Sequence, residues 1–163
     1  SIVEASGNFA RSSWSSRLNA IEGDFTSVTL PEKYDLIVSN PPFFSNGIQS
    51  PVASRRCARH TVSLTLAQLL SKAKSMLSSA GKIAVVLPVQ ELQVLLEVAL
   101  DNNLHVSHIT RVYSVAGKDC LRVLVEMSSV ADFVCEDELY IQLPGGEYTD
   151  EFKSLCRDFY LRF

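Results

Sequence analysis

The sequence of 163 residues predicts an α/β fold in which a parallel sheet ends in an antiparallel hairpin. Two apolar runs, at residues 36–38 and 83–87, have the continuous apolar character of parallel strands that are covered on both faces. Apolar residues at three- and four-residue intervals lie between these runs and predict a helix. Two further β-rich runs, at 104–113 and 121–127, are joined by too few residues for a crossover helix, so we expect them to pair antiparallel.

The individual elements follow from apolar periodicity and from turn residues. Before residue 17 we expect a helix, and Gly81 is expected to stop the helix that separates the two apolar runs. A second long helix is expected to end in the turn-prone Asp101-Asn102-Asn103. The expected strands are 17–22, 34–39, 83–87, 104–113, 121–127 and 138–142, and the expected helices after residue 60 are 64–77, 92–100 and 150–161.

Composition limits the classes of protein that the chain can belong to. Nearly half of the residues are apolar, which is enough to form the core of a single domain over residues 1–163. No apolar stretch reaches the roughly 20 residues that span a bilayer, and the formal charge of −3 argues against a general nucleic-acid binder. We therefore expect no membrane partner. The four cysteines have neither zinc-site nor disulfide spacing, so we also expect no metal and a reducing cytoplasm; these residues are Cys57, Cys120, Cys135 and Cys156.

Asn40-Pro41-Pro42-Phe43 directly follows the apolar run at 34–39. Ligands of open α/β sheets bind at the carboxyl ends of strands, which is where these four residues lie. The Asn40 side-chain oxygen and the Pro41 carbonyl can accept the two hydrogens of an exocyclic amine, and the prolines fix the backbone that holds both acceptors. Phe43 can stack on the base. The alternative is that Asn-Pro-Pro is only a strand-ending turn.

A dense basic cluster follows this segment. Arg55, Arg56, Arg59 and His60 lie close together and can bind phosphate groups of a nucleic acid. A run of charges is also typical of a solvated surface, and His60 can instead cap the following helix. The residues alone leave these alternatives open.

Several separated motifs resemble the bacterial tRNA1(Val) adenine-37 N6-methyltransferases, which are class I S-adenosylmethionine-dependent enzymes with a Rossmann-like sheet. The motifs occur in the same order as in the family and extend over nearly the whole chain. They are Ala10-Arg11-Ser12 with Trp14, Asn40-Pro41-Pro42-Phe43-Phe44, Ala58-Arg59-His60, Gly117-Lys118, Arg122-Val123-Leu124-Val125-Glu126, Gly146-Glu147-Tyr148-Thr149 and Arg157-Asp158-Phe159-Tyr160-Leu161.

The resemblance implies methyl transfer from S-adenosylmethionine to the N6 amine of adenine 37 in a valine tRNA, without a covalent intermediate. It implies that Asp24 accepts a hydrogen bond from the adenine amine of the cofactor, with Phe25 and Asn40 also at the cofactor site. Asp24 can otherwise be a solvated turn residue after Gly23. Lys118 and Arg122 join the basic cluster as expected tRNA contacts.

The sequence departs from the family at its front. No glycine-rich cofactor loop occurs, Glu4 is poorly placed to serve as the acid that holds the ribose, and Phe43 replaces the more usual tyrosine. We therefore expect the chain to correspond to the last two-thirds of the family domain, without its first two strands. Their absence leaves a gap in the sheet, and the chain alone is expected to bind the cofactor weakly and to be inactive.

Two alternatives remain open at this point. The same Asn-Pro-Pro motif serves glutamine N5-methyltransferases of release factors, whose partner is a protein. A non-catalytic binding module is the other alternative, because the cofactor loop is absent. The sequence does not determine the oligomeric state.

Overall fold

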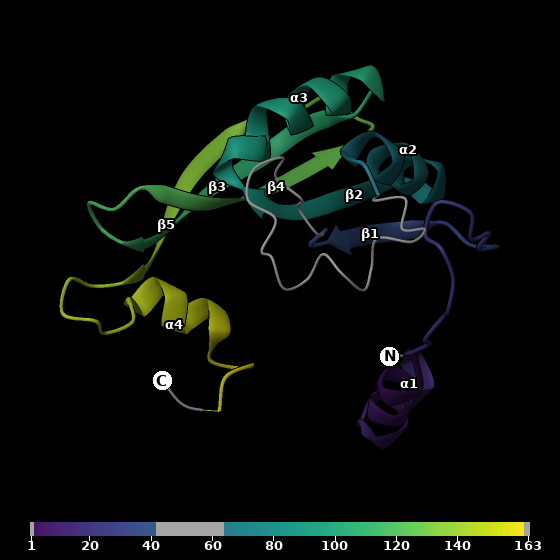
Figure 1. Cartoon of the computed structure of the whole chain (residues 1–163), viewed down its shortest axis with the longest axis horizontal. Coiled ribbons are helices and arrows are strands. Elements are labelled where there is room, and N and C mark those ends of the chain that lie inside the picture. The colour runs from purple at the N-terminus through teal and green to yellow at the C-terminus, as the bar shows by residue number, and fades with distance from the viewer. Residues whose placement is uncertain (1, 42–63, 162–163) are drawn as a thin grey trace, which may run out of the picture. The chain divides into compact units, whose positions relative to one another are not determined.

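The computed structural model describes residues 2–41 and 64–161 (Figure 1). These residues group into two compact units, residues 1–30 and residues 31–163. The first unit contains helix α1 (Ile2–Arg11) and the short 3-10 helix η1 (Ser15–Arg17). The second unit contains the sheet, and the expectation of one domain over residues 1–163 stays a prediction.

Five strands form one sheet in the order β1-β2-β4-β3-β5. Strand β1 pairs with β2 in parallel, β4 pairs antiparallel with both β2 and β3, and β3 pairs with β5 in parallel. The predicted parallel pair and the predicted hairpin are therefore confirmed. Because β4 alone runs in the opposite direction, the carboxyl ends of the other four strands lie along one edge of the sheet. The strands are β1 (Tyr34–Ser39), β2 (Leu77–Pro88), β3 (His105–Val115), β4 (Cys120–Ser128) and β5 (Cys135–Gln142).

Helices α2 (Leu66–Met76) and α3 (Leu92–Asp101) cover one face of this sheet (Figure 1). Helix α2 begins at a capping box, in which the Thr65 hydroxyl accepts from the Gln68 amide and the Gln68 side chain accepts from the Thr65 amide. The short 3-10 helix η2 (Val89–Glu91) connects β2 to α3. Both long helices appear where their apolar periodicity predicts them.

The core lies between α2, α3 and this covered face. Alternate residues of β2 and β4 are fully buried there, as the inward face of a half-covered sheet requires. The most buried side chains are Leu70, Ile83, Val85, Leu87, Leu95, Leu104, Val123, Val125 and Met127.

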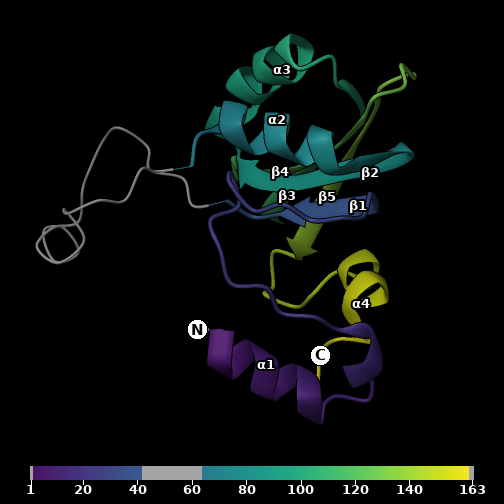
Figure 2. The same ribbon diagram turned by 90° about the vertical axis from the view of Figure 1, so that its right-hand side faces the viewer.

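The opposite face, which we call the open face, carries only the short helix α4 (Asp150–Cys156) among residues 31–41 and 64–161 (Figure 2). Leu36 and Val38 of β1 are 59% and 67% exposed on it. The sequence indicated strands covered on both faces, whereas residues 31–41 and 64–161 cover one face with long helices. Among these residues β1 is an edge strand that pairs only with β2.

The expected strand at 17–22 is wrong, since Ser15–Arg17 forms η1 and residues 18–22 have no regular secondary structure. A strand is stabilised by a hydrogen-bonded neighbour, and no described segment pairs with this one. Leu18 and Ile21 are accordingly 39% and 52% exposed.

Gly81 is not a helix stop but lies inside β2. Helix α2 ends earlier, where the Leu77 amide donates to the Lys74 carbonyl. A Cβ at Gly81 would lie 2.7 Å from the Tyr34 carbonyl oxygen, next to a bulge in the β1–β2 pairing. The glycine therefore allows a close approach between strands.

The closing helix is shorter than expected, because α4 ends at Cys156 instead of continuing to Leu161. The Phe159 and Tyr160 amides both donate to the Cys156 carbonyl, which closes the chain into a turn. Phe159 and Leu161 are 83% and 102% exposed, so no apolar packing supports a further helical turn there. In the part of the chain that the structure describes, no helix is both long and apolar enough to cross a bilayer.

Candidate active site

Asn40 and Pro41 lie at the carboxyl end of β1, as the sequence predicts. Asn40 is exposed directly after the last strand residue, Ser39, which is paired with Val85 of β2. Pro41 is buried, so its ring anchors the backbone that presents the Asn40 side chain. The Asn40 amide has no hydrogen-bond partner among the described residues and is free to bind a ligand. Pro42 and Phe43, the other two residues of the motif, lie outside the described residues.

Asp24 organises a turn in the first unit. Its Oδ1 accepts hydrogen bonds from the Thr26 amide and the Thr26 hydroxyl, both at 2.8 Å. These two bonds hold the pKa of Asp24 below its ordinary value, so the carboxylate is charged at neutral pH. Oδ2 has no partner within residues 2–41 and 64–161, and Phe25 lies half-buried in the same turn. Asp24 is therefore a turn residue that keeps one acceptor oxygen for a ligand.

The residues expected at the cofactor site belong to different units. Asp24 and Phe25 lie in the unit of residues 1–30, whereas Asn40 lies in the unit of residues 31–163. Each is locally suited to its expected contact, since Asp24 has a free carboxylate oxygen and Asn40 a free amide. Both groups are acceptors of the kind that an adenine amine requires, and no glycine-rich loop occurs in the sequence.

The dense basic cluster lies outside the described residues, since Arg55, Arg56, Arg59 and His60 all fall between 42 and 63. The other two expected RNA contacts belong to the β3–β4 hairpin. Lys118 is exposed at its tip, where its amide donates to the Val115 carbonyl and Gly117 has a φ of 82°. Arg122 is exposed near the start of β4, level with Pro88 at the carboxyl end of β2.

A row of cross-strand polar pairs, not predicted from the sequence, joins β3 to β5. His108 lies 3.0 Å from Asp137, Arg111 pairs with Glu136, and the hydroxyls of Tyr113 and Tyr140 both donate to Glu138. The two tyrosine rings also stack, with centroids 4.9 Å apart. The run Glu136-Asp137-Glu138 at a sheet edge was the available signal, because such charges need partners on the neighbouring strand.

The His108–Asp137 pair lies on the open face and contributes to its charge. The hydroxyl of Thr110, followed by His108, lowers the pKa of Asp137, so this carboxylate stays ionised. Asp137, His108 and Glu126 line a cavity of about 400 Å³ between the sheet and α4. Val38, Ala84, Val86, Leu124, Leu139 and Leu155 supply its apolar lining. Within the described ranges, no three His, Cys, Asp or Glu side chains are placed to hold a metal ion.

The strand order and the comparisons with known proteins define a class I methyltransferase fold. A "predicted O-methyltransferase" from Agrobacterium tumefaciens superposes with a TM-score of 0.65 over 88% of this chain and 64% of that chain, at 16% identity. The model of the methyltransferase small domain family matches residues 1–115.

Curated relatives at higher identity carry a more specific name, "tRNA1(Val) (adenine(37)-N6)-methyltransferase". The protein of that name from Aliivibrio fischeri ES114 is 40% identical over 94% of this chain and 65% of its own length. The one from Vibrio campbellii is 35% identical over 99% of this chain and 67% of its own length. The chain belongs to the methyltransferase small domain family and, within it, to the tRNA1(Val) (adenine(37)-N6)-methyltransferase family. It spans about 65% of the length of the first three of these relatives.

Proposed function

We propose that the protein carrying this sequence transfers a methyl group from S-adenosylmethionine to the N6 amine of adenine 37 in tRNA1(Val). The observation that carries the proposal is an exposed Asn40, without a side-chain partner among the described residues, at the carboxyl end of a parallel strand and followed by a buried Pro41. Relatives at 32–40% identity bear the name of this activity. Residues 1–163 then form one part of a methyltransferase domain that works in the cytoplasm.

The chemical task is to make an aromatic amine nucleophilic. The lone pair of an exocyclic amine is delocalised into the base, so acceptors for both N–H bonds return electron density to nitrogen. The Asn40 Oδ1 and the Pro41 carbonyl serve as these two acceptors, and the buried proline fixes their spacing before the substrate binds. S-adenosylmethionine, when bound, supplies an electrophilic methyl group on a sulfonium, so no covalent enzyme intermediate is needed.

Other residues bind and orient the two substrates. Asp24 accepts from the adenine amine of the cofactor through the Oδ2 that its turn leaves free, and Phe25 packs against the same base. Phe43, outside the described residues, stacks on the target base and offsets part of the few kcal/mol that unstacking it requires. The basic residues bind tRNA phosphates; these are Arg55, Arg56, Arg59, His60, Lys118 and Arg122.

Methyl acceptance from labelled S-adenosylmethionine tests the proposal on the full-length protein. Unmodified tRNA from a strain that lacks the enzyme is compared with a release-factor peptide containing its acceptor glutamine. We expect incorporation into tRNA alone. Incorporation into the peptide alone would establish the glutamine N5-methyltransferase instead, and binding of tRNA without any incorporation would establish a non-catalytic module.

A further inference from the structure

We infer that the end of the β3–β4 hairpin binds the tRNA at two positions. Arg122 binds a phosphate beside the target adenine, and Lys118 binds a phosphate of the adjoining stem. The inference rests on the proposed function, which it deepens by assigning separate parts of the substrate to two residues. Three observations support it: the face of the sheet on which the two side chains lie, their distance from Asn40, and their lack of ion pairs among the described residues.

Arg122 and Asn40 lie on the same face of the sheet at the same edge. Side chains alternate along a strand, so Asn40 follows the side of Leu36 and Val38, which are exposed on the open face. Arg122 follows the side of Leu124 on β4, and Leu124 lines the open-face cavity together with Val38. The intervening Val123 is fully buried on the opposite side.

The strand register gives the separation between the two residues. Ser39 is paired with Val85, so Asn40 is level with Val86, and Arg122 is paired with Pro88 two residues further on. Two strand spacings of about 4.8 Å and two residue rises of about 3.3 Å place the two Cα atoms about 12 Å apart. The long side chain of Arg122 can therefore bind a phosphate of the target nucleotide or its immediate neighbour.

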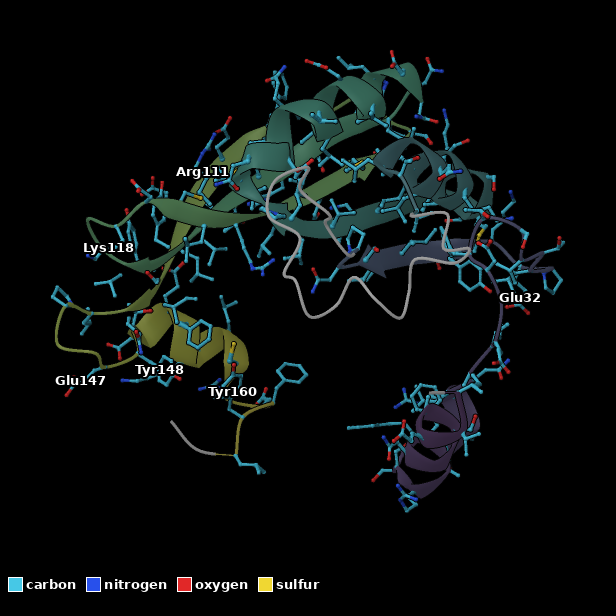
Figure 3. The ribbon with its side chains drawn as sticks, viewed as in Figure 1. Glu32, Arg111, Lys118, Glu147, Tyr148 and Tyr160 are labelled. Atoms are coloured by element: carbon cyan, nitrogen blue, oxygen red, sulfur yellow. The ribbon has the colours of Figure 1, made fainter. Side chains whose placement is uncertain are left out.

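Lys118 lies further from Asn40. It is at the hairpin tip, beyond the end of β1 in the direction in which that strand points (Figure 3). The Tyr113–Cys120 pair closes the strands before the turn, so Lys118 extends past the sheet edge. A phosphate that Lys118 binds is consequently several nucleotides from the base at Asn40.

Among the described residues Lys118 and Arg122 have no acidic partner, whereas three other basic side chains of the sheet do. Lys82 pairs with Glu126 at 3.0 Å, Arg111 pairs with Glu136, and His108 lies 3.0 Å from Asp137. Among the described residues neither Lys118 nor Arg122 has an ion pair. Their charge is therefore available for phosphate without first breaking an internal contact.

The remainder of the open face is less favourable for phosphate, because its cations Lys82 and His108 already pair with carboxylates. Glu126 follows Arg122 by four residues on the same side of β4, and Asp137 and Glu151 line the same cavity. The lowered pKa of Asp137 keeps this carboxylate ionised at neutral pH beside His108. The RNA backbone therefore follows the sheet edge from Arg122 to Lys118 and does not descend over the face.

The test compares Arg122→Gln, Lys118→Gln and Lys72→Gln in the full-length protein. Lys72 is a matched control, because it is also without an ion pair among the described residues but lies on α2, which covers the opposite face. Binding is measured over a range of salt concentrations with two RNAs, a single-stranded oligonucleotide of the anticodon loop and a stem-loop that adds the anticodon stem. Methyl transfer to the stem-loop supplies kcat and KM.

We expect Arg122→Gln to reduce the salt slope by about 0.7 on both RNAs, and Lys118→Gln to reduce it by about 0.9 on the stem-loop alone. Both changes should raise KM and leave kcat near its original value, since phosphate binding is shared by the ground and transition states. Arg122→Lys should restore the slope. Slopes equal to those of Lys72→Gln, or an equal effect of Lys118→Gln on the oligonucleotide, would overturn the inference. A lack of transfer by the unaltered protein would instead refute the proposed function.

Discussion

Replacing Asn40 by alanine removes one of the two proposed acceptors while leaving the fold intact. Asn40 is exposed, follows the last residue of β1, and makes no side-chain hydrogen bond among the described residues. Substitutions at such positions usually change the free energy of unfolding by less than about 0.5 kcal/mol. The Ala variant should therefore unfold at nearly the same temperature as the unaltered protein.

The effect on turnover should be much larger. Removing one preorganised hydrogen-bonding group that acts in a transition state typically lowers kcat by about 10²–10³, or about 2.7–4 kcal/mol. Asn40→Asp retains an acceptor oxygen, so its kcat should lie between those of the unaltered protein and the Ala variant. Single-turnover methyl transfer to tRNA at saturating substrate measures this difference without a contribution from product release.

Ser39→Ala is the neighbouring control, because Ser39 precedes Asn40 and lies on the other side of the strand. It should transfer methyl at nearly the original rate. Full activity of Asn40→Ala would refute the acceptor role. A loss of activity that is matched by an equal loss of thermal stability would show that Asn40 supports the fold instead.

Four further predictions concern the base pocket, the sheet, the Asp24 turn and the cofactor. Phe43→Ala should lower turnover far more than Phe43→Tyr, since stacking requires the ring; equal rates in a transfer assay would place Phe43 outside the pocket. Gly81→Ala should reduce the free energy of unfolding by about 1–3 kcal/mol in urea titrations, because its Cβ would lie 2.7 Å from the Tyr34 carbonyl oxygen, and an unchanged midpoint would contradict that close approach. Thr26→Val should raise the pKa of Asp24 toward its ordinary value in an NMR titration, since it removes the hydroxyl that is the largest single cause of the lowering. The stability that Asp24 contributes is present above its ordinary pKa and lost as pH falls through the lowered value, so this acid sensitivity should shrink in the variant. A polypeptide of these 163 residues should show no tight S-adenosylmethionine binding by calorimetry, and stoichiometric tight binding would mean that the missing glycine loop is not needed.

The sequence was sufficient for elements whose local pattern agrees with their packing. The apolar periodicity of α2 and the branched run of β1 predicted both elements close to their observed bounds. The four-residue connection at Ala116-Gly117-Lys118-Asp119 predicted the antiparallel hairpin for a geometric reason. Because Asn40 and Pro41 directly follow the strand, the sequence also predicted that they lie at the edge of the sheet formed by the carboxyl ends of the parallel strands.

The errors came from interactions that are distant in sequence. Residues 18–22 resemble a strand, but among the described residues no neighbour pairs with them. Gly81 resembles a helix stop in the sequence. A glycine is needed there because the Tyr34 carbonyl approaches closely, and this contact exists only once β1 and β2 are paired. Helix α4 ends early because Phe159 and Leu161 have no apolar surface to cover. The pairs of β3 with β5 depend on a register that periodicity does not provide.

The position of the transferred methyl group tests the central claim most directly. Unmodified tRNA1(Val) is incubated with the full-length protein and S-adenosylmethionine, digested to nucleosides, and analysed by chromatography and mass spectrometry against methyladenosine standards. Two acceptors at Asn40 and Pro41 hold an exocyclic amine, so the product should be N6-methyladenosine, and a tRNA with guanine at position 37 should accept nothing there. Methylation of a ring nitrogen, a ring carbon or a ribose hydroxyl would contradict the assignment of this edge of the sheet as the amine site.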